Sequence, residues 1–263
     1  MTFAPTFAPA ARNLAATMAS FAYGIPGARV AEKPAFTLVD TGKTFGAFNS
    51  AILREEACER TFVESLDGTA EYFAAQGSPW SYWVCEGFLE PPLRRQLTRV
   101  FAKRKLQHTS SSPGMIASQL APPKRPLPSL PIRRVGDPAT IRGFCHLMAV
   151  TFDGPSRELG SMYRRPELWT QSHFRGYLGS VRGFDVTGGI TVVAGGVIGL
   201  YAVATLPEFM RRGYGEALMR FAIEDTQADY GPMPIVLQSS PVALKLYRRM
   251  GFQQTAQFSL YST

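Results

Sequence analysis

The stretch VATLPEFMRRGYGEAL, residues 203–218, has the pattern of a strand that runs through a glycine-containing bend into a helix. The strand half ends a β-branched apolar run at residues 197–205, which is typical of a central strand. The helix half repeats apolar residues at helical spacing, with Leu218 and Ala222 inward. Backbone N–H groups converge at such a bend and the helix dipole adds partial positive charge, so the bend favours a pyrophosphate ligand.

The side chains of this bend suit the same ligand. Gly213 and Gly215 leave no Cβ between backbone and ligand, while Arg211 and Arg212 add formal positive charge. The pattern is neither a Walker A loop nor a GxGxxG fingerprint. A basic turn taken alone is more often just a turn, so its meaning depends on the surrounding elements.

The surroundings follow a definite order after residue 131: strand, two helices, three antiparallel strands, helix, strand, helix, strand. The strands are expected at residues 132–135, 174–181, 184–194, 197–205 and 235–238, with a last one around 256–260. Asp137-Pro138 is a typical helix start, with the aspartate as N-cap and the proline at the first helical position. The helix expected at residues 241–250 lies within a second notable stretch, SPVALKLYRRMGF, residues 240–252.

These two stretches resemble the two signatures of the GNAT N-acetyltransferase superfamily, Q/R-x-x-G-x-G/A and N-x-x-A-x-x-L-Y-x-x-x-G-F. The resemblance covers about the last 130 residues and departs from the family at Met210, in place of Q/R, and at Ser240, in place of Asn. It implies an α+β GNAT fold, with a mixed, mostly antiparallel central sheet flanked by helices. It also implies an acyltransferase that uses acetyl-CoA as co-substrate and acetylates a primary amine.

The resemblance also implies a set of site residues. The strand backbone at residues 203–205 would pair with the pantetheine arm, and Tyr247 would act as general acid near the cofactor sulfur. Tyr247 also lies on an apolar helix face with Leu246 and Met250, so a packing role is the alternative. The expected cofactor contacts are Val203, Ala204, Thr205, Arg211, Arg212, Gly213, Tyr214, Gly215, Glu216, Ala217 and Ser240.

Other candidate groups are weaker. Glu208, Asp153 and Glu158 lie near regions that line the acceptor cleft of the family, but the sequence identifies no general base. No cysteine or serine lies where a covalent acetyl-enzyme would need one, which favours direct attack in a ternary complex. No metal site is expected, because the three cysteines are far apart and lack metal-ligand spacing.

The clearest domain boundary is APPKRPLPSLP, residues 121–131, with five prolines in eleven residues, which predicts an extended linker. From Ala35 the preceding region repeats strand, helix, strand, helix, strand, as in the latter half of the GNAT order. The expected elements are strand material at 35–53, a helix at 62–76 with Gly77 as its stop, a strand at 80–85, a helix at 91–105 and a strand around 115–120. Its counterpart of the phosphate bend, residues 53–60, has three acids and no glycine. We therefore expect a degenerate GNAT-like domain at residues 1–120, the linker at 121–131 and the acetyltransferase domain at 132–263, two GNAT-like domains in tandem.

Composition and charge limit the classes of partner that are expected. The 263-residue chain carries a net charge of +8, but its basic residues are scattered, so nucleic acid is not expected as a partner. No apolar run approaches the roughly 20 residues of a membrane span, and the odd, dispersed cysteines favour a reduced, cytoplasmic setting. The expected acceptor is a small-molecule amine, and a homodimer is left open. The alternatives are a protein or peptide N-acetyltransferase and a non-catalytic CoA-binding sensor or scaffold.

Overall fold

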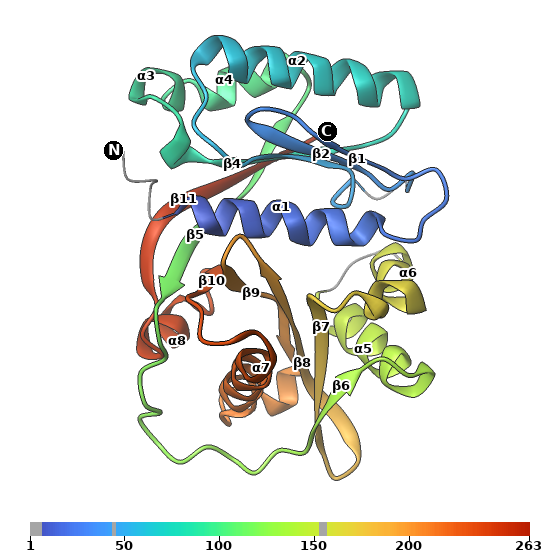
Figure 1. Ribbon diagram of the computed structural model, residues 1–263, viewed down its shortest axis with the longest axis vertical. Coiled ribbons are helices and arrows are strands. Elements are labelled where there is room, and N and C mark those ends of the chain that lie inside the picture. Colours follow the sequence, from blue (N-terminus) through green and yellow to red (C-terminus); the bar gives the residue numbers. More distant parts are fainter. Residues whose placement is uncertain (1–6, 44–45, 153–156) are drawn as a thin grey trace. The chain divides into compact units, whose positions relative to one another are not determined.

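The computed structural model describes residues 7–43, 46–152 and 157–263, with the side chains of 157–159 left out (Figure 1). The chain forms two compact units, and each unit is built from segments that are not contiguous in the sequence. Unit 1 contains Met1–Met115, Gln238–Ser240 and Gln254–Thr263, and unit 2 contains Ile116–Leu237 and Pro241–Gln253. Residues 254–263, expected in the C-terminal domain, therefore belong to unit 1.

Unit 1 is built on a sheet whose strands follow a non-sequential order. In spatial order the strands are β1 (Arg29–Glu32), β2 (Phe36–Asp40), β3 (Ser50–Leu53), β4 (Ser81–Cys85), β11 (Gln253–Ser262) and β5 (Gln107–Ala117). β3 and β4 pair in parallel, and β4 pairs antiparallel with β11, so that Ser81 faces Ser262. Figure 1 shows the red β11 running beside the cyan β4. The ring of Tyr261 on β11 stacks at 3.9 Å on Phe101, which joins β11 to the unit 1 core.

Helices lie on both faces of these strands. They are α1 (Ala8–Ala22), α2 (Glu59–Gln76), α3 (Pro91–Arg94) and α4 (Leu97–Ala102), with α1 and α2 on opposite faces of β1–β4 (Figure 1). On the α2 face, Phe73 stacks on Trp80 with ring centroids 5.4 Å apart, and Tyr82 is fully buried. Gly77, with a left-handed φ of +61°, ends α2 where its sequence predicts.

Three details of unit 1 differ from the sequence expectation. The single helix expected at 91–105 is broken into α3 and α4, because Gln96 leaves the helical conformation with φ −108° and ψ 2°. β5 starts at Gln107 rather than near 115. β1 was not expected, since its four residues, RVAE, are mostly exposed and lack an apolar face.

The described strands of unit 2 lie in the spatial order β10 (Ile235–Gln238), β9 (Val197–Thr205), β8 (Phe184–Ala194), β7 (Phe174–Val181) and β6 (Ile132–Val135). Only β9 and β10 pair in parallel, and the others are antiparallel. These bounds match the strands predicted from sequence. The helices are α5 (Pro138–Thr151), α6 (Arg157–Arg164), α7 (Tyr214–Tyr230) and α8 (Leu244–Arg249), with short 3-10 turns at Pro166–Thr170 and Pro207–Phe209.

Helices lie on both faces of this sheet (Figure 1), and two neighbouring residues of β7 face them. Tyr177 packs against Leu218 of α7 and donates a hydrogen bond of 2.8 Å to Asp225. Leu178 points to the other face, where a Cβ placed on Gly143 of α5 would lie 3.2 Å from it. α5 begins as predicted, since the Asp137 carboxylate accepts hydrogen bonds from the first-turn amides. Those bonds and the Thr140 hydroxyl lower the pKa of Asp137.

The proline-rich segment, residues 121–131, forms no helix or strand and is hydrogen-bonded to other parts of unit 2 at both of its ends. The N–H of Ala121 donates to Met250 O at 2.8 Å, and Arg220 Nη2 donates to Ala121 O at 2.7 Å. At the other end, the N–H of Ser180 donates to Pro131 O at 3.0 Å. The segment is therefore part of unit 2.

Candidate functional site

Strand β9 carries a β-bulge close to its C-terminal end. Gly188 of β8 pairs with Ala204, whereas Ile190 pairs with Tyr201, so β9 advances by three residues while β8 advances by two. Ala202 takes up the extra residue with a φ of +49°, which is uncommon for a residue with a Cβ. A bulge bends its strand and increases the local twist.

The parallel ladder between β9 and its neighbour β10 ends before the bulge. Within the described residues, the ladder to β10 consists of Ile198–Ile235 and Gly199–Val236, both before the bulge. Beyond it, Ala204 O accepts a 2.8 Å hydrogen bond from the Thr187 hydroxyl on the β8 side. The predicted stretch 203–205 therefore follows the last ladder pair with β10, and an extended ligand can pair with its backbone as an added strand.

The bend after β9 leads into a helix that no side chain caps. Arg211 has a φ of +60°, and Gly213, the N-cap of α7, has a φ of +92°. The first helical hydrogen bond runs from the N–H of Ala217 to Gly213 O at 2.9 Å. The preceding N–H groups, of Tyr214 to Glu216, lie in the first helical turn, where amides lack an intrahelical acceptor. They and the helix dipole therefore favour an anion at this bend.

Both predicted glycines lie close to neighbouring atoms of the protein. A Cβ on Gly213 would lie 3.0 Å from Pro128 Cδ, and its left-handed φ would strain any other residue. A Cβ on Gly215 would lie 3.1 Å from Thr205 Oγ1. The bend is thus pressed closely against the end of β9 on one side and the proline-rich segment on the other.

The two arginines of the bend keep their charges at the surface. Arg211 and Arg212 are exposed, and neither forms an ion pair within the ranges that the structure describes. The Arg212 guanidinium lies 5.5 Å from the centroid of the Phe209 ring, a cation–π contact. Met210, at the position of the family's Q/R, is 45% exposed. An anion at the bend would therefore meet two cationic side chains.

Glu216 has a different environment from the other predicted contacts. Its carboxylate is 4% exposed and pairs with Arg220 at 2.9 Å and with Arg249 of α8 at 3.2 Å. The carboxylate thus joins α7 to α8. Only the backbone N–H of Glu216 stays a candidate ligand contact.

Tyr247 is buried in α8, with its ring 5.6 Å from Phe252 in a T-shaped arrangement. Burial raises the pKa of its hydroxyl to about 12, so the group is protonated at neutral pH. α8 begins at Leu244 rather than at the predicted Pro241, and residues 241–243 form a turn. Ser240 belongs to unit 1, so the structure does not group it with the residues of the bend.

The structure assigns no general base among the three candidate carboxylates. Glu208 is exposed in the turn before the bend. Asp153 lies outside the described residues, as does the side chain of Glu158. Across the described ranges, no cluster of three or more His, Cys, Asp or Glu side chains could hold a metal ion.

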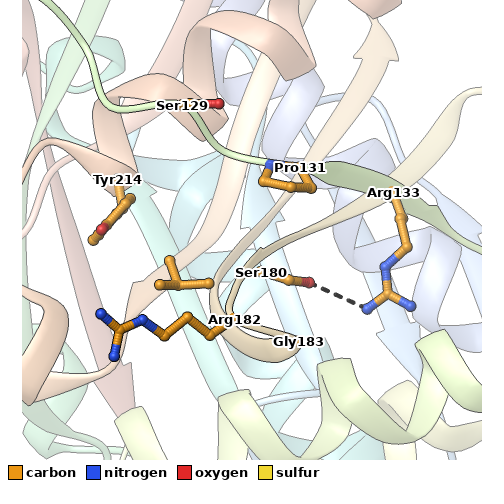
Figure 2. Close-up of a pocket in the computed structure, with 8 residues that line it drawn as sticks. Ser129, Pro131, Arg133, Ser180, Arg182, Gly183 and Tyr214 are labelled. Carbon is orange, nitrogen blue, oxygen red and sulfur yellow. Dashed lines mark hydrogen bonds between the residues drawn. The ribbon is translucent and has the colours of Figure 1, made fainter.

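A cavity of about 430 Å³ lies beside the bend in unit 2 (Figure 2). Its walls come from the proline-rich segment, β6, the β7–β8 turn and the first residue of α7, and the lining residues are Ser129, Pro131, Arg133, Ser180, Val181, Arg182, Gly183 and Tyr214. Arg133 is paired with Asp185, and Figure 2 shows its bond to Ser180. Arg182 and Gly183 form the tight turn with φ values of +51° and +83°. The sequence predicted this turn but not the cavity, which only the tertiary structure assembles.

Comparison with known proteins finds one family match, which lies mostly within unit 2. Residues 172–254 match the family model of the acetyltransferase (GNAT) domain. No protein of the curated set matches. Residues 172–254 therefore carry an acetyltransferase (GNAT) domain.

Solved structures share the fold over nearly the whole chain. A GCN5-related N-acetyltransferase from Kribbella flavida is 17% identical, with 98% of this chain and 95% of that chain covered and a TM-score of 0.71. A functionally unknown conserved protein from Staphylococcus epidermidis is 13% identical, with 91% and 94% covered and a TM-score of 0.63. A GCN5-related N-acetyltransferase from Sphaerobacter thermophilus is 15% identical, with 99% and 94% covered and a TM-score of 0.54. At these identities the likeness concerns the fold.

The described helices were also compared with the requirements of a membrane span. None of them is both long enough and apolar enough to cross a bilayer.

Proposed function

We propose that unit 2 binds acetyl-CoA and transfers its acetyl group to a primary amine, with a small molecule as the acceptor. One observation carries this proposal: the bulged end of β9 leads through a short turn into the uncapped, glycine-started N-terminus of α7. The family match over residues 172–254 covers the same segment. An extended arm and a pyrophosphate joined in one ligand fit this succession of strand edge and helix N-terminus.

Different residues of unit 2 would contact different parts of acetyl-CoA. The backbone at residues 203–205 would pair with the pantetheine arm, and the first-turn amides of α7 would hold the pyrophosphate. Arg211 and Arg212 add charge-assisted contacts to phosphate oxygens. When bound, acetyl-CoA supplies an activated thioester. A backbone N–H in the bulged part of β9 would stabilise negative charge on the acyl oxygen as it develops.

Tyr247 would hold the proton for the departing sulfur. Its raised pKa keeps the hydroxyl protonated, so it can donate a hydrogen bond to a thiolate. Direct attack by the amine is supported by the environment of the thiols. Burial raises the pKa of Cys85 to about 12 and also raises that of Cys145, which makes both poor nucleophiles. Cys58 is exposed but belongs to unit 1.

The test is thiol release from acetyl-CoA against a panel of small amines and N-terminal peptides, for the wild type and for Tyr247→Phe. We expect turnover with one class of small amine. Tyr247→Phe should lower kcat by about 100-fold, the usual contribution of a general acid, at unchanged acetyl-CoA affinity. Tyr230→Phe, at the far end of α7, is the matched control and should leave kcat unchanged.

The other outcomes separate the alternatives. Turnover with peptides alone would make the chain a peptide or protein N-acetyltransferase. Acetyl-CoA binding without turnover on any acceptor would favour a CoA-binding sensor or scaffold. Absence of acetyl-CoA binding by the wild type would overturn the proposal.

A further inference from the structure

The phosphate bend lacks one side-chain donor that its sequence pattern normally supplies. Met210 stands at that position, is 45% exposed, and has no group that can donate a hydrogen bond. The structure places another cationic side chain at the same bend from a distant part of the sequence. That side chain is Arg125, in the middle of the proline-rich segment.

Arg125 touches the bend directly. Its Nη2 donates a hydrogen bond of 3.2 Å to Arg211 O. The same Nη2 lies 3.9 Å from the position that a Cβ on Gly213 would occupy, and Pro128 Cδ lies 3.0 Å from it. The bond to Arg211 uses one of the five N–H donors of a guanidinium, and the exposed side chain leaves the others accessible to a ligand.

The segment that carries Arg125 is restrained on both sides. Ala121 is held by Met250 and Arg220, and Pro131 accepts a hydrogen bond from Ser180. Five prolines fix their own φ angles and reduce the conformational freedom of the segment in the unfolded chain. The backbone that carries Arg125 is therefore ordered before the ligand binds. Binding then costs little backbone entropy in this segment.

We propose that Arg125 binds the pyrophosphate of the acyl-CoA and supplies the donor that Met210 lacks. This inference rests on the proposed function of unit 2. It makes the proline-rich segment a wall of the phosphate site. The competing role for Arg125 is a structural one, in which its only task is to attach the segment to Arg211 O.

Binding measurements by calorimetry distinguish the two roles. We expect Arg125→Ala to weaken acetyl-CoA binding by about 10-fold, as for one charge-assisted contact. Arg125→Gln can still donate to a carbonyl but carries no charge, so it should bind as weakly as Arg125→Ala. Lys124→Ala removes an equal charge from the neighbouring exposed residue and should bind like the wild type. In the Arg125→Ala background, Met210→Arg should restore most of the lost affinity.

A second ligand identifies the phosphate group involved. Acetyl-dephospho-CoA keeps the pyrophosphate but lacks the 3′-phosphate, so Arg125→Ala should weaken its binding by the same factor. A loss seen only with acetyl-CoA would overturn the pyrophosphate assignment, and wild-type affinity in Arg125→Gln would establish the structural role instead. Wild-type affinity in Arg125→Ala would overturn this inference alone. Failure of the unmodified chain to bind either ligand would overturn the proposed function as well.

Discussion

The two units contain comparable strand-to-helix bends that differ in almost every feature relevant to phosphate binding. In unit 1, β3 runs into α2, and in unit 2, β9 runs into α7, each beside a parallel neighbour. β3 pairs regularly with β4 from Ser50–Ser81 to Ile52–Trp83. β9 is bulged at Ala202, and its ladder with β10 consists of two pairs before the bulge. Only the second arrangement leaves a strand edge for an extended ligand.

The helix starts differ as well. α2 begins after Cys58 in an extended conformation with φ −68°, and the Cys58 thiol lies 3.3 Å from the Thr61 hydroxyl. The preceding residues include Glu55 and Glu56, whose charges would repel a pyrophosphate. α7 instead begins at left-handed Gly213 after two arginines.

The comparison teaches that a strand-to-helix topology alone does not make a phosphate site. The bulge, the glycine start and the positive side chains are needed together. We therefore propose that unit 1 is a degenerate GNAT-like domain and that the chain binds one acetyl-CoA, at unit 2.

The largest expected effect comes from giving the unit 2 bend the charge of its counterpart. Arg211→Glu combined with Arg212→Glu should weaken acetyl-CoA binding by about 1,000-fold, because two charge-assisted contacts become repulsive. Arg60→Glu, in the first turn of α2, should leave the affinity unchanged. Calorimetry gives both the affinity and the number of sites. Two sites per chain, or an unaffected double variant, would break the comparison.

A smaller effect is expected from the first-turn acids of the two helices. Glu216 is buried and paired with two arginines, whereas Glu59 of α2 is exposed. Glu216→Gln should lower the free energy of unfolding by about 1–2 kcal/mol, because the buried side chain loses its charge-assisted bonds to Arg220 and Arg249. Glu59→Gln should change it by less than about 0.5 kcal/mol. Chemical denaturation checks both, and equal effects would contradict the structural role of Glu216.

The smallest expected effect concerns Cys58, at the start of α2. Hydrogen bonds from Thr61 lower the pKa of Cys58, so its thiolate fraction at pH 7 exceeds that of an ordinary cysteine. Iodoacetamide should label Cys58 faster than the buried Cys85 and Cys145, at a rate that falls as the pH drops through the lowered pKa. Labelling should leave acetyl-CoA affinity unchanged, because the thiol lies in unit 1.

Thr61→Val is the control for this thiol. It removes the hydrogen bond between the Thr61 hydroxyl and the Cys58 thiol and should slow labelling at pH 7 several-fold. Loss of acetyl-CoA binding on labelling would show that the unit 1 bend takes part in the site after all.

The strands of unit 2 and the position of the bend could be predicted from sequence because their signals are local. Long apolar runs such as 197–205, the turn at Arg182–Gly183 and the start at Asp137-Pro138 carry their conformational preferences in adjacent residues. The β-bulge could not be predicted, since nothing about Ala202 as a residue type favours a positive φ. The sequence thus located the end of β9 without revealing the bulge in it.

Tertiary features escaped prediction for a related reason. Prolines indicate that residues 121–131 are extended, but not which surface they pack on, so the position of Arg125 was not foreseen. Likewise, the alternation at Ala256, Phe258 and Leu260 predicts a strand and its faces, but not its partner. The Glu216 contacts with Arg220 and Arg249 join two helices, and only the first of these pairs has helical spacing.

The membership of β11 in unit 1 has a consequence for the folding of the protein during its synthesis. Ser81 and Ser262, which face each other across the β4–β11 ladder, are 181 residues apart in sequence. At about 5–20 residues per second, the edge of β4 stays open while all of unit 2 is synthesised. An open edge is a template for pairing with other chains, so the order of synthesis exposes β4 to such pairing until β11 is made. Synthesis of unit 1 begins before that of unit 2 and ends after it.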